Sequence, residues 1–342
     1  MFAHNHTIIG LDIGSDTIKM AEVKQSAQGG ELLTYGSAKH DLLLDGYWDS
    51  SKLRGLARII EDIIESAGFV GNRTVMSVPS KDVYVTTMDF DLDMTKKEIQ
   101  TEIEKQAPYF LPYPPDEMRL SWSLIENDPR IRAATGKQRI IINALPDFVI
   151  ENSKNLLEHC NLDGTALENQ TISQIRSSLT PDNGNTVLVD FGANQTTFNI
   201  IVDGILRSSS HIPVGSNKIT KDLSTSLGID ISTAEYLKKD FSLVNLYQLP
   251  QPIVDGLTTL RTELNTFVEL NKKVAQTPDK VVFTGGGVYT AGFLEFFKNF
   301  QVPIYLANPS RQVVISDEYK PYLMPILNQL SAAIGLALRD DV

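Results

Sequence analysis

Cysteine is almost absent from this chain of 342 residues, which has Cys160 alone. A disulfide framework and a site of several thiolate metal ligands are therefore excluded. The five histidines show no spacing that would bring two of them to one helix face, so we expect no zinc site. Basic residues are also in deficit, with 31 Lys and Arg against 42 Asp and Glu. Because a duplex nucleic-acid binder needs a basic face, we expect no nucleic-acid partner.

Long hydrophobic runs are missing as well. No stretch reaches the roughly 18 apolar residues that a membrane span needs, and the first residues lack the apolar segment of a signal peptide. We therefore expect a cytoplasmic protein without a membrane span of its own. Hydrophobic residues make up 42% of the chain, which is ordinary for a globular protein. The length exceeds what one hydrophobic core usually organises, so two domains are expected.

Two glycine-bearing stretches, residues 10–19 and 189–196, share one pattern. Each follows an apolar, strand-like run, places an Asp at its end, turns through Gly and small polar residues, and resumes strand character. Such a hairpin turn directs backbone N–H groups into a nest for an anion, and glycine lets a phosphate approach where a Cβ would collide. An ordinary hairpin explains one such loop equally well. Two of them, far apart in the chain, predict opposed cradles around a nucleotide.

Four polar residues of these loops have defined candidate roles. In the first loop, Asp12 can orient the water shell of a Mg²⁺ ion on a triphosphate, and Lys19 can reach a phosphate. Asp190 and Thr196 offer the same roles from the second loop. The sequence therefore places a carboxylate and a phosphate-binding group on each side of the predicted cleft.

Three further features have both a functional and a structural interpretation. The glycines at 285–287 follow an apolar strand and would let a purine lie on the backbone. A simple tight turn, the structural alternative, rarely needs three glycines. Glu235 and Lys238 share a face of a predicted helix and can contact ribose, although a solvated ion pair is the simpler explanation. Glu168 is predicted at the start of a helix at 167–179, where it can polarise a water or merely complement the helix dipole.

The order of predicted elements suggests a duplicated architecture. A β-α-β-β block at about 80–146 is inserted into the first part of the chain. A turn-rich segment at 180–185 is the predicted boundary between a first lobe at 1–180 and a second lobe at 181–342. Strands at 186–190, 196–202 and 205–212 then repeat the opening of the chain. A small-residue segment at 330–338 lies in a predicted terminal helix at 322–339.

In order and separation, the three glycine loops and the small-residue segment resemble the actin-like ATPase superfamily. The resemblance implies an α/β fold with two duplicated RNase H-like lobes around a nucleotide cleft, and a C-terminal helix at 322–339 that connects back to the first lobe. Within this superfamily, the chain resembles the PilM family of type IV pilus assembly proteins, which are relatives of FtsA. The features that carry this resemblance are the Asp12-Ile13-Gly14-Ser15 run with Lys19, the Ile212-Pro213-Val214-Gly215 turn and the insert.

The resemblance implies ATP and Mg²⁺ in the cleft, with Asp12 and Asp190 acting on the metal through water. It assigns cofactor binding to Asp12, Gly14, Ser15, Asp16, Thr17, Lys19, Asp190, Gly192, Ala193, Asn194, Gln195, Thr196, Gly215, Lys218, Glu235, Lys238, Gly285, Gly286, Gly287 and Val288. Asp16 stands where a small hydroxyl residue is usual, and Ser216 where a second glycine is common. Glu168, the candidate catalytic residue, matches the carboxylate of active ATPases only loosely, so we expect weak or absent hydrolysis.

Family membership further implies an adaptor that docks the N-terminal cytoplasmic peptide of a bitopic, PilN-like inner-membrane partner. Nucleotide binding would then be coupled to lobe closure, and the partner would hold the protein at the inner membrane. Three alternatives stay open. They are an actin-fold ATPase or sugar kinase-like phosphotransferase, a self-associating FtsA-like filament, and the cytoplasmic part of a type II secretion protein, which the lack of a C-terminal membrane helix disfavours.

Overall fold

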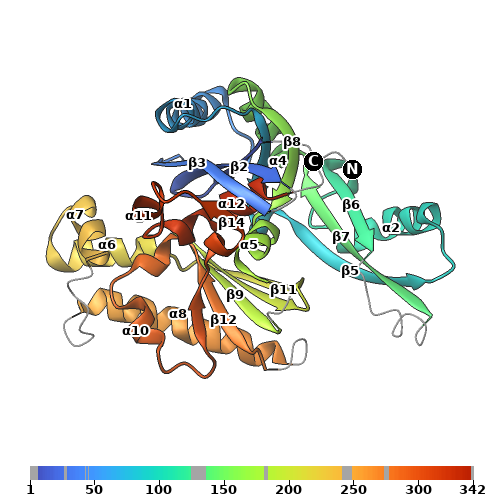
Figure 1. Cartoon of the computed structure of the whole chain (residues 1–342). Helices are drawn as coiled ribbons and strands as arrows, with labels where there is room; N and C mark the ends of the chain where they lie inside the picture. The colour runs from blue at the N-terminus through green and yellow to red at the C-terminus, as the bar shows by residue number, and fades with distance from the viewer. Residues whose placement is uncertain are drawn as a thin grey trace.

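The computed structural model describes residues 7–26, 29–42, 44, 46–124, 136–180, 184–240, 249–272 and 277–339 (Figure 1). The predicted boundary at 180–185 lies partly outside these residues and stays a prediction. The described chain forms three sheets with helices packed against them. No helix of this part of the chain combines the length and the apolar character that crossing a membrane demands.

The first sheet has six strands in the order β14-β3-β2-β1-β4-β8. Antiparallel pairing joins β1 to β2 and β2 to β3, whereas β4 pairs parallel with β1, and β8 parallel with β4. The strands are β1 (Thr7–Ile13), β2 (Thr17–Ser26), β3 (Gly29–Lys39), β4 (Arg73–Val78), β8 (Asp163–Asn169) and β14 (Val313–Ile315). The late strand β14 joins this sheet by parallel pairing with β3, which the sequence analysis did not anticipate.

The second sheet repeats this arrangement, in the order β11-β10-β9-β12-β13. Its first three strands are antiparallel neighbours, and its last two are added in parallel, as β4 and β8 are in the first sheet. The strands are β9 (Thr186–Phe191), β10 (Thr196–Val202), β11 (Ile205–Ile212), β12 (Lys280–Thr284) and β13 (Ile304–Leu306). The shared strand order confirms the predicted duplication.

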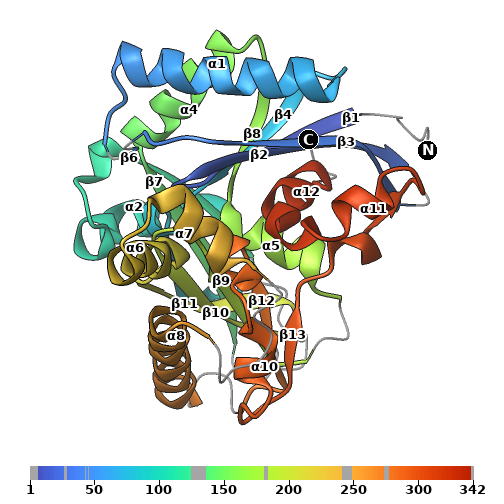
Figure 2. The ribbon, with the colours of Figure 1, turned by 90° about the vertical axis from the view of Figure 1, so that its left-hand side faces the viewer.

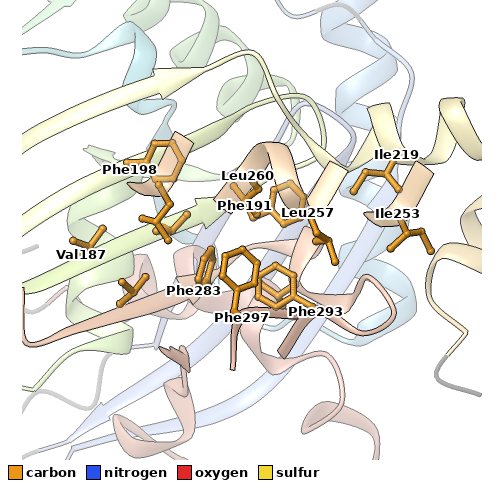
Figure 3. Packing of buried hydrophobic residues seen from close by; sticks show 14 of the residues in the cluster. Val187, Phe191, Phe198, Ile219, Ile253, Leu257, Leu260, Phe283, Phe293 and Phe297 are labelled. Atoms are coloured by element: carbon orange, nitrogen blue, oxygen red, sulfur yellow. The ribbon is translucent and has the colours of Figure 1, made fainter. Parts of the chain in front are cut away.

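Amphipathic helices cover the outer face of each sheet. On the first sheet these are α1 (Ser50–Ala67) and α4 (Asp147–His159). On the second they are α6 (Ser216–Leu227), α7 (Ile231–Lys238), α8 (Gln251–Leu270) and α10 (Phe293–Phe297). Four phenylalanines, Phe191, Phe283, Phe293 and Phe297, pack together in this second core with ring centroids 5.0–6.1 Å apart (Figure 3). Their packing fixes the end of β9, where the second glycine loop begins.

Two short helices, α5 (Gln170–Ser178) and α12 (Ser331–Ala337), lie between the sheets (Figure 2). They pack closely against each other, and α12 packs closely against β1, because small residues meet at both contacts. A Cβ on Gly335 would lie 1.8 Å from the carbonyl oxygen of Ser173, and one on Gly10 would lie 1.9 Å from that of Ala333. The small-residue segment is therefore a contact between backbones, and Gly10 serves packing rather than ligand approach.

The predicted insert is present as a separate three-stranded sheet in the order β5-β7-β6, with a core of its own beside the first lobe (Figure 1). Its elements are β5 (Tyr84–Asp91), α2 (Lys96–Phe110), β6 (Met118–Leu124) and β7 (Lys137–Pro146). A reciprocal capping box between Thr95 and Glu98 fixes the start of α2. The chain enters the insert through a 3₁₀ turn, η1 (Ser80–Asp82), directly after β4.

Two predicted helices differ from the structure. The helix predicted at 167–179 begins at Gln170, because the Asn169 side chain accepts a hydrogen bond from the Thr171 N–H and caps it. Glu168 therefore lies on β8 and not in a first helical turn. The terminal helix predicted at 322–339 is divided into α11 (Lys320–Leu323), η7 (Leu327–Leu330) and α12, since Pro325 has no N–H to donate. Short 3₁₀ turns also form at η2 (Pro115–Glu117), η5 (Gly286–Tyr289) and η6 (Pro309–Arg311).

The close approach of α5 and α12 predicts that Gly335→Ala is strongly destabilising. Because the new methyl would overlap a backbone carbonyl that cannot rotate away, the free energy of unfolding should fall by about 3 kcal/mol. Gly55→Ala is the matched control, since Gly55 lies inside α1 and meets the end of the Leu42 side chain at 3.3 Å. It should gain up to about 1 kcal/mol of helix propensity. Urea unfolding of both variants measures the difference, and equal stabilities would contradict this packing.

Candidate functional site

A cavity of about 560 Å³ opens between the two sheets and receives residues from both of them. Its walls include the β1–β2 turn, the β9–β10 turn, the first turns of α5 and α6, and the loop after β12. All five segments follow the ends of strands at the same edge of the two sheets. The two predicted cradles are therefore brought to one cavity, as expected from the sequence.

The two turns have the same backbone geometry. The Gly14 N–H donates to the carbonyl of Thr17 at 3.1 Å, and the Gly192 N–H donates to the carbonyl of Gln195 at 3.0 Å. In each hairpin an Asp of the first strand stands two residues before the glycine of the turn. The remaining turn residues, Ser15, Asp16, Ala193 and Asn194, all line the cavity. Duplication has thus produced two matched turns that face each other.

The two Asp carboxylates are held by neighbours from other strands and helices. Asp12 is 1% exposed, accepts a hydrogen bond from Ser77 Oγ at 2.8 Å and lies 3.5 Å from Lys19 Nζ. Asp190 accepts one from Gln174 Nε2 at 2.8 Å. Burial raises the pKa of Asp190, the Gln174 hydrogen bond opposes this, and the negative charge of Asp12 raises it further. The two carboxylates therefore repel each other across the cavity.

Strand register corrects one assignment in the second loop. Asp12 lies opposite Lys19 in the first hairpin, and Asp190 lies opposite Thr197 in the second. Thr197 lines the cavity, whereas the Thr196 hydroxyl is fully buried and donates to the carbonyl of Val214 at 2.6 Å. Because side chains alternate along a strand, only one of two adjacent threonines can face the cavity. The structure therefore turns Thr197 toward the cavity, and not the Thr196 of the sequence analysis.

The start of α6 closes the second turn from behind. The Ser216 and Asn217 N–H groups donate to the carbonyls of Gly192 and Ala193 at 3.0 and 2.8 Å. A Cβ on Gly215 would lie 2.3 Å from the carbonyl oxygen of Ala193, so the close approach depends on this glycine. Ser216 is no obstacle to it and lines the cavity. Lys218 points outward in an exposed ion pair with Asp222 and is not among the lining residues.

Asp16, the unusual residue of the first turn, has a partner in the other lobe. Its carboxylate accepts a hydrogen bond from Asn217 Nδ2 at 3.2 Å, and the same amide also donates to Asn194 at 3.1 Å. Behind the turn, buried His40 contacts the carbonyl of Gly14 at 2.8 Å through Nε2. Its Nδ1 accepts from the Leu42 N–H, so Nε2 is the donor. Asp16 therefore links the lobes, and His40 fixes the first turn.

The third glycine cluster divides between cavity and core. Gly285 has φ 91°, and a Cβ there would lie 2.4 Å from Asp190 Oδ1. Gly285 and Gly286 line the cavity. Gly287 instead packs on the ring of Phe191, and Val288 is 5% exposed within the second core. Two of the four assigned residues thus reach the cavity, and the other two position them.

The predicted pair Glu235 and Lys238 forms a buried ion pair rather than a solvated one. Lys238 is 1% exposed, its Nζ lies 2.6 Å from Glu235 Oε2, and it also donates to Thr220 Oγ1 and the carbonyl of Ser216. Burial opposes ionisation of Glu235, but Lys238 and hydrogen bonds from Lys239 and Thr220 lower its pKa to about 2. Glu235 and Lys239 line the cavity, whereas Lys238 supports Glu235 from behind.

Glu168 lies outside the cavity lining. Both carboxylate oxygens accept hydrogen bonds from Arg176 at 2.7 Å, and Arg339 approaches to 3.6 Å. Arg176 also donates to the carbonyl of Gly335, so this ion pair joins β8, α5 and α12. Sequence reasoning missed Gln170 and Gln174, which face the cavity from α5. Their position depends on the residue at which α5 begins. In the sequence, only Asn169, as a residue that favours helix caps, indicates that starting point.

The described residues fit a nucleotide with a water-bound metal. Nowhere in the described part of the chain do three His, Cys, Asp or Glu side chains gather as direct metal ligands. Asp12 and Asp190 can instead accept hydrogen bonds from the waters of a Mg²⁺ ion. Gln174 Oε1 is buried without a hydrogen-bond partner among the described residues. An acceptor left unpaired beside the Asp190 carboxylate suits a site that receives additional donors on ligand binding.

The buried pair predicts a pH-dependent variant. Glu235→Gln leaves the Lys238 ammonium buried without a counter-charge, which should cost about 3 kcal/mol at neutral pH. Burial already lowers the pKa of Lys238, and loss of Glu235 lowers it further. Above this lowered pKa the unfolded chain binds a proton that the folded one does not, so stability should rise with pH from there up to about 10. Urea unfolding at pH 7 and 9 measures this rise. The double variant Glu235→Gln/Lys238→Met should recover most of the loss, and a wild-type pH profile in the single variant would contradict the pairing.

Comparison with known proteins agrees with this geometry. The family model of the type IV pilus assembly protein PilM matches residues 10–341. The cell division protein FtsA of Neisseria meningitidis is 24% identical over 245 residues, covering 64% of this chain and only 56% of that relative.

Among solved structures, a chain of the PilM–PilN type IV pilus biogenesis complex superposes with a TM-score of 0.81 at 19% identity, covering 98% of both chains. MreB5 of Spiroplasma citri bound to AMPPNP superposes with a TM-score of 0.52 at 12% identity, covering 97% of this chain and 95% of that one. These likenesses show the actin-like ATPase fold. With the family match over nearly its whole length, the chain belongs to the type IV pilus assembly protein PilM family.

Proposed function

We propose that the protein is an ATP-binding adaptor of type IV pilus assembly, with the nucleotide and Mg²⁺ held in the cavity between the lobes. One observation carries the nucleotide part of this proposal. The matched turns at Gly14 and Gly192 face one cavity, each with an Asp two residues before its glycine. Turns of this kind favour anions, because backbone N–H groups point outward from a concave surface.

The charges of the cavity suit a magnesium–triphosphate complex. Lys19 and Lys39 offer positive charge from the first lobe, and Lys239 offers it from the second. Asp12 and Asp190 would hold the waters of Mg²⁺, and the cation would relieve the repulsion between the two carboxylates. Gln174 Oε1 is placed to accept a further hydrogen bond beside Asp190. Glu235 and Lys239 would contact ribose, and the flat backbone at Gly285 and Gly286 leaves room for the base.

Nucleotide binding would favour a closed arrangement of the lobes. A bound polyphosphate contacts both turns only when they are close, so it stabilises that arrangement relative to an open one. The Asp16–Asn217 hydrogen bond is a contact of the same kind between the first turn and α6. The AMPPNP held by the structurally similar MreB5 supports the choice of an adenine nucleotide.

The adaptor part of the proposal concerns the junction of the first lobe with the insert. Tyr47, Phe148 and Tyr113 form an aromatic surface there, with ring centroids 5.5 Å apart for Tyr47 and Phe148 and 6.4 Å for Tyr113 and Phe148. Tyr47 is 65% exposed and Tyr113 is 48% exposed, whereas Phe148 also lines the cavity. We propose that this surface docks the N-terminal cytoplasmic peptide of a PilN-like inner-membrane protein, as the name of the similar complex suggests.

An adaptor accounts for Glu168 better than a phosphotransferase does. The bidentate Arg176 pair holds this carboxylate away from the cavity, so we assign it a structural role in place of the catalytic role considered from the sequence. Through its partner the protein would lie on the cytoplasmic side of the inner membrane. Self-association is not needed for this role.

Lys19→Met tests the nucleotide site. Loss of a charged hydrogen-bond donor to phosphate should weaken ATP binding in the presence of Mg²⁺ by roughly ten- to a hundredfold. Lys24→Met, which changes a lysine further along the same strand, is the matched control and should bind as the wild type does. Isothermal titration calorimetry measures both, and equal affinities would rule out a phosphate contact at Lys19.

Tyr113→Ala tests the docking surface. Removal of an aromatic anchor should weaken binding of a synthetic peptide, taken from the N-terminus of the PilN-like protein of the same organism, by about tenfold or more. Tyr109→Ala is the control, because Tyr109 is 89% exposed on α2 and lies outside the three-ring surface. Fluorescence anisotropy of the labelled peptide gives both affinities. Equal loss in both variants, or none in either, would remove this surface from the proposal.

A further inference from the structure

A chain of hydrogen-bonding side chains runs behind the cavity from the insert to the second sheet. Ser80 Oγ lies 2.9 Å from Asn169 Oδ1 and 2.7 Å from Thr171 Oγ1. Thr171 Oγ1 lies 3.4 Å from Asn199 Oδ1, which also accepts from Ser209 Oγ at 2.8 Å. We call these five residues the polar chain. Its three central members, Ser80, Thr171 and Asn199, are 8%, 1% and 0% exposed, so water does not replace these contacts.

The polar chain joins the root of the insert, the start of α5 and the second sheet. Ser80 begins η1, where the backbone leaves the first sheet for the insert. Asn169 and Thr171 belong to the start of α5, which lies between the sheets. Asn199 is in the middle of β10 and shares a strand face with Thr197, which lines the cavity. The polar chain therefore extends from the wall of the cavity to the root of the insert.

Proton counting shows that the polar chain has too few donors for its contacts. The contacts Ser80–Asn169, Ser80–Thr171 and Thr171–Asn199 each join two oxygen atoms, so each of the three needs a proton. The hydroxyls of Ser80 and Thr171 supply only two. In one arrangement Thr171 donates to Ser80, and Ser80 donates to Asn169, which keeps both protons in the first lobe. In the other, Ser80 donates to Thr171, and Thr171 donates to Asn199 across the lobes. A third arrangement, in which Ser80 donates to Asn169 and Thr171 donates to Asn199, leaves the two hydroxyl oxygens 2.7 Å apart with no proton between them, and their repulsion disfavours it. The first two arrangements exclude each other.

Neither arrangement leaves an amide oxygen unsatisfied. Asn169 Oδ1 keeps the Thr171 N–H at 2.8 Å when Ser80 turns away. Asn199 Oδ1 keeps the Ser209 hydroxyl when Thr171 turns away. Because every acceptor retains a donor in both cases, the arrangements differ little in free energy, and a small displacement can select between them.

We propose that the polar chain is a hydrogen-bond switch that couples lobe closure to the insert. The inference rests on the proposed function, since nucleotide binding supplies the closure. The cross-lobe contact between Thr171 and Asn199 is the longest of the three, and closure shortens it. The Thr171 hydroxyl then donates to Asn199, and the Ser80 hydroxyl turns to donate to Thr171. The root of the insert thereby loses its hydrogen bond to Asn169. The docking surface beside the insert changes with it.

Thr171→Val tests the switch, because it removes the relay hydroxyl and leaves Ser80 with Asn169 as its acceptor in every state. Hydrogen–deuterium exchange of the wild type with and without ATP and Mg²⁺ should show roughly fivefold faster exchange at residues 80–91 when the ligand is bound. In Thr171→Val this acceleration should disappear, while calorimetry finds an unchanged affinity for ATP. Thr74→Val is the matched control, since its fully buried hydroxyl donates to the carbonyl of Asn72 and should leave the acceleration intact.

Ser80→Ala is the second variant and should also abolish the acceleration, which covers the case of a poorly folded Thr171→Val protein. If the wild type gives no binding heat with ATP and Mg²⁺, the proposed function and the switch both fail. If ATP binds and both variants keep the wild-type acceleration, the switch alone is wrong. Wild-type exchange that ATP leaves unchanged also overturns the switch while leaving nucleotide binding in place.

Discussion

Repulsion between two carboxylates, Asp12 and Asp190, is the constraint on which the site depends. Each lies one residue before the end of its strand, β1 or β9, and duplication of the fold brings both to one cavity. The negative charge of Asp12 helps to raise the pKa of Asp190. Lys19 and Gln174 offset part of the repulsion. A divalent cation shared by both carboxylates would offset the rest and draw the lobes together.

The contacts at the centre of the fold differ in kind from those between the lobes. Backbone contact between α5 and α12 fixes the inner helices, and the Glu168–Arg176 pair ties them to β8. Between the lobes near the cavity, by contrast, the described contacts include hydrogen bonds such as Asp16–Asn217 and Thr171–Asn199. Hydrogen bonds of 3.2–3.4 Å are easily remade, whereas packed backbones are not. Packed backbones therefore hold the centre of the molecule, whereas hydrogen bonds bridge the cleft.

Sequence reasoning predicted the duplicated fold, the insert and both turns, because glycine spacing and apolar runs report local backbone geometry. It did not predict where side-chain direction decides which residue faces the cavity. Thr196 and Thr197 are adjacent, and only strand register shows that Thr197 faces the cavity. Glu168 was misplaced because Asn169, a residue that favours helix caps, moves the start of α5 to Gln170. Gly287 and Lys238 are next to residues that line the cavity, but they are themselves buried in the packing that holds those residues in place. Only tertiary packing shows which residues face the cavity.

Titration of the wild-type protein with ATP, in Mg²⁺ and then in EDTA, tests the central claim most directly, because it asks whether one cation-bound nucleotide joins the two turns. The account predicts one binding site per chain and a clear loss of affinity when the metal is removed. Equal affinity with and without Mg²⁺, or no binding in either condition, would contradict it.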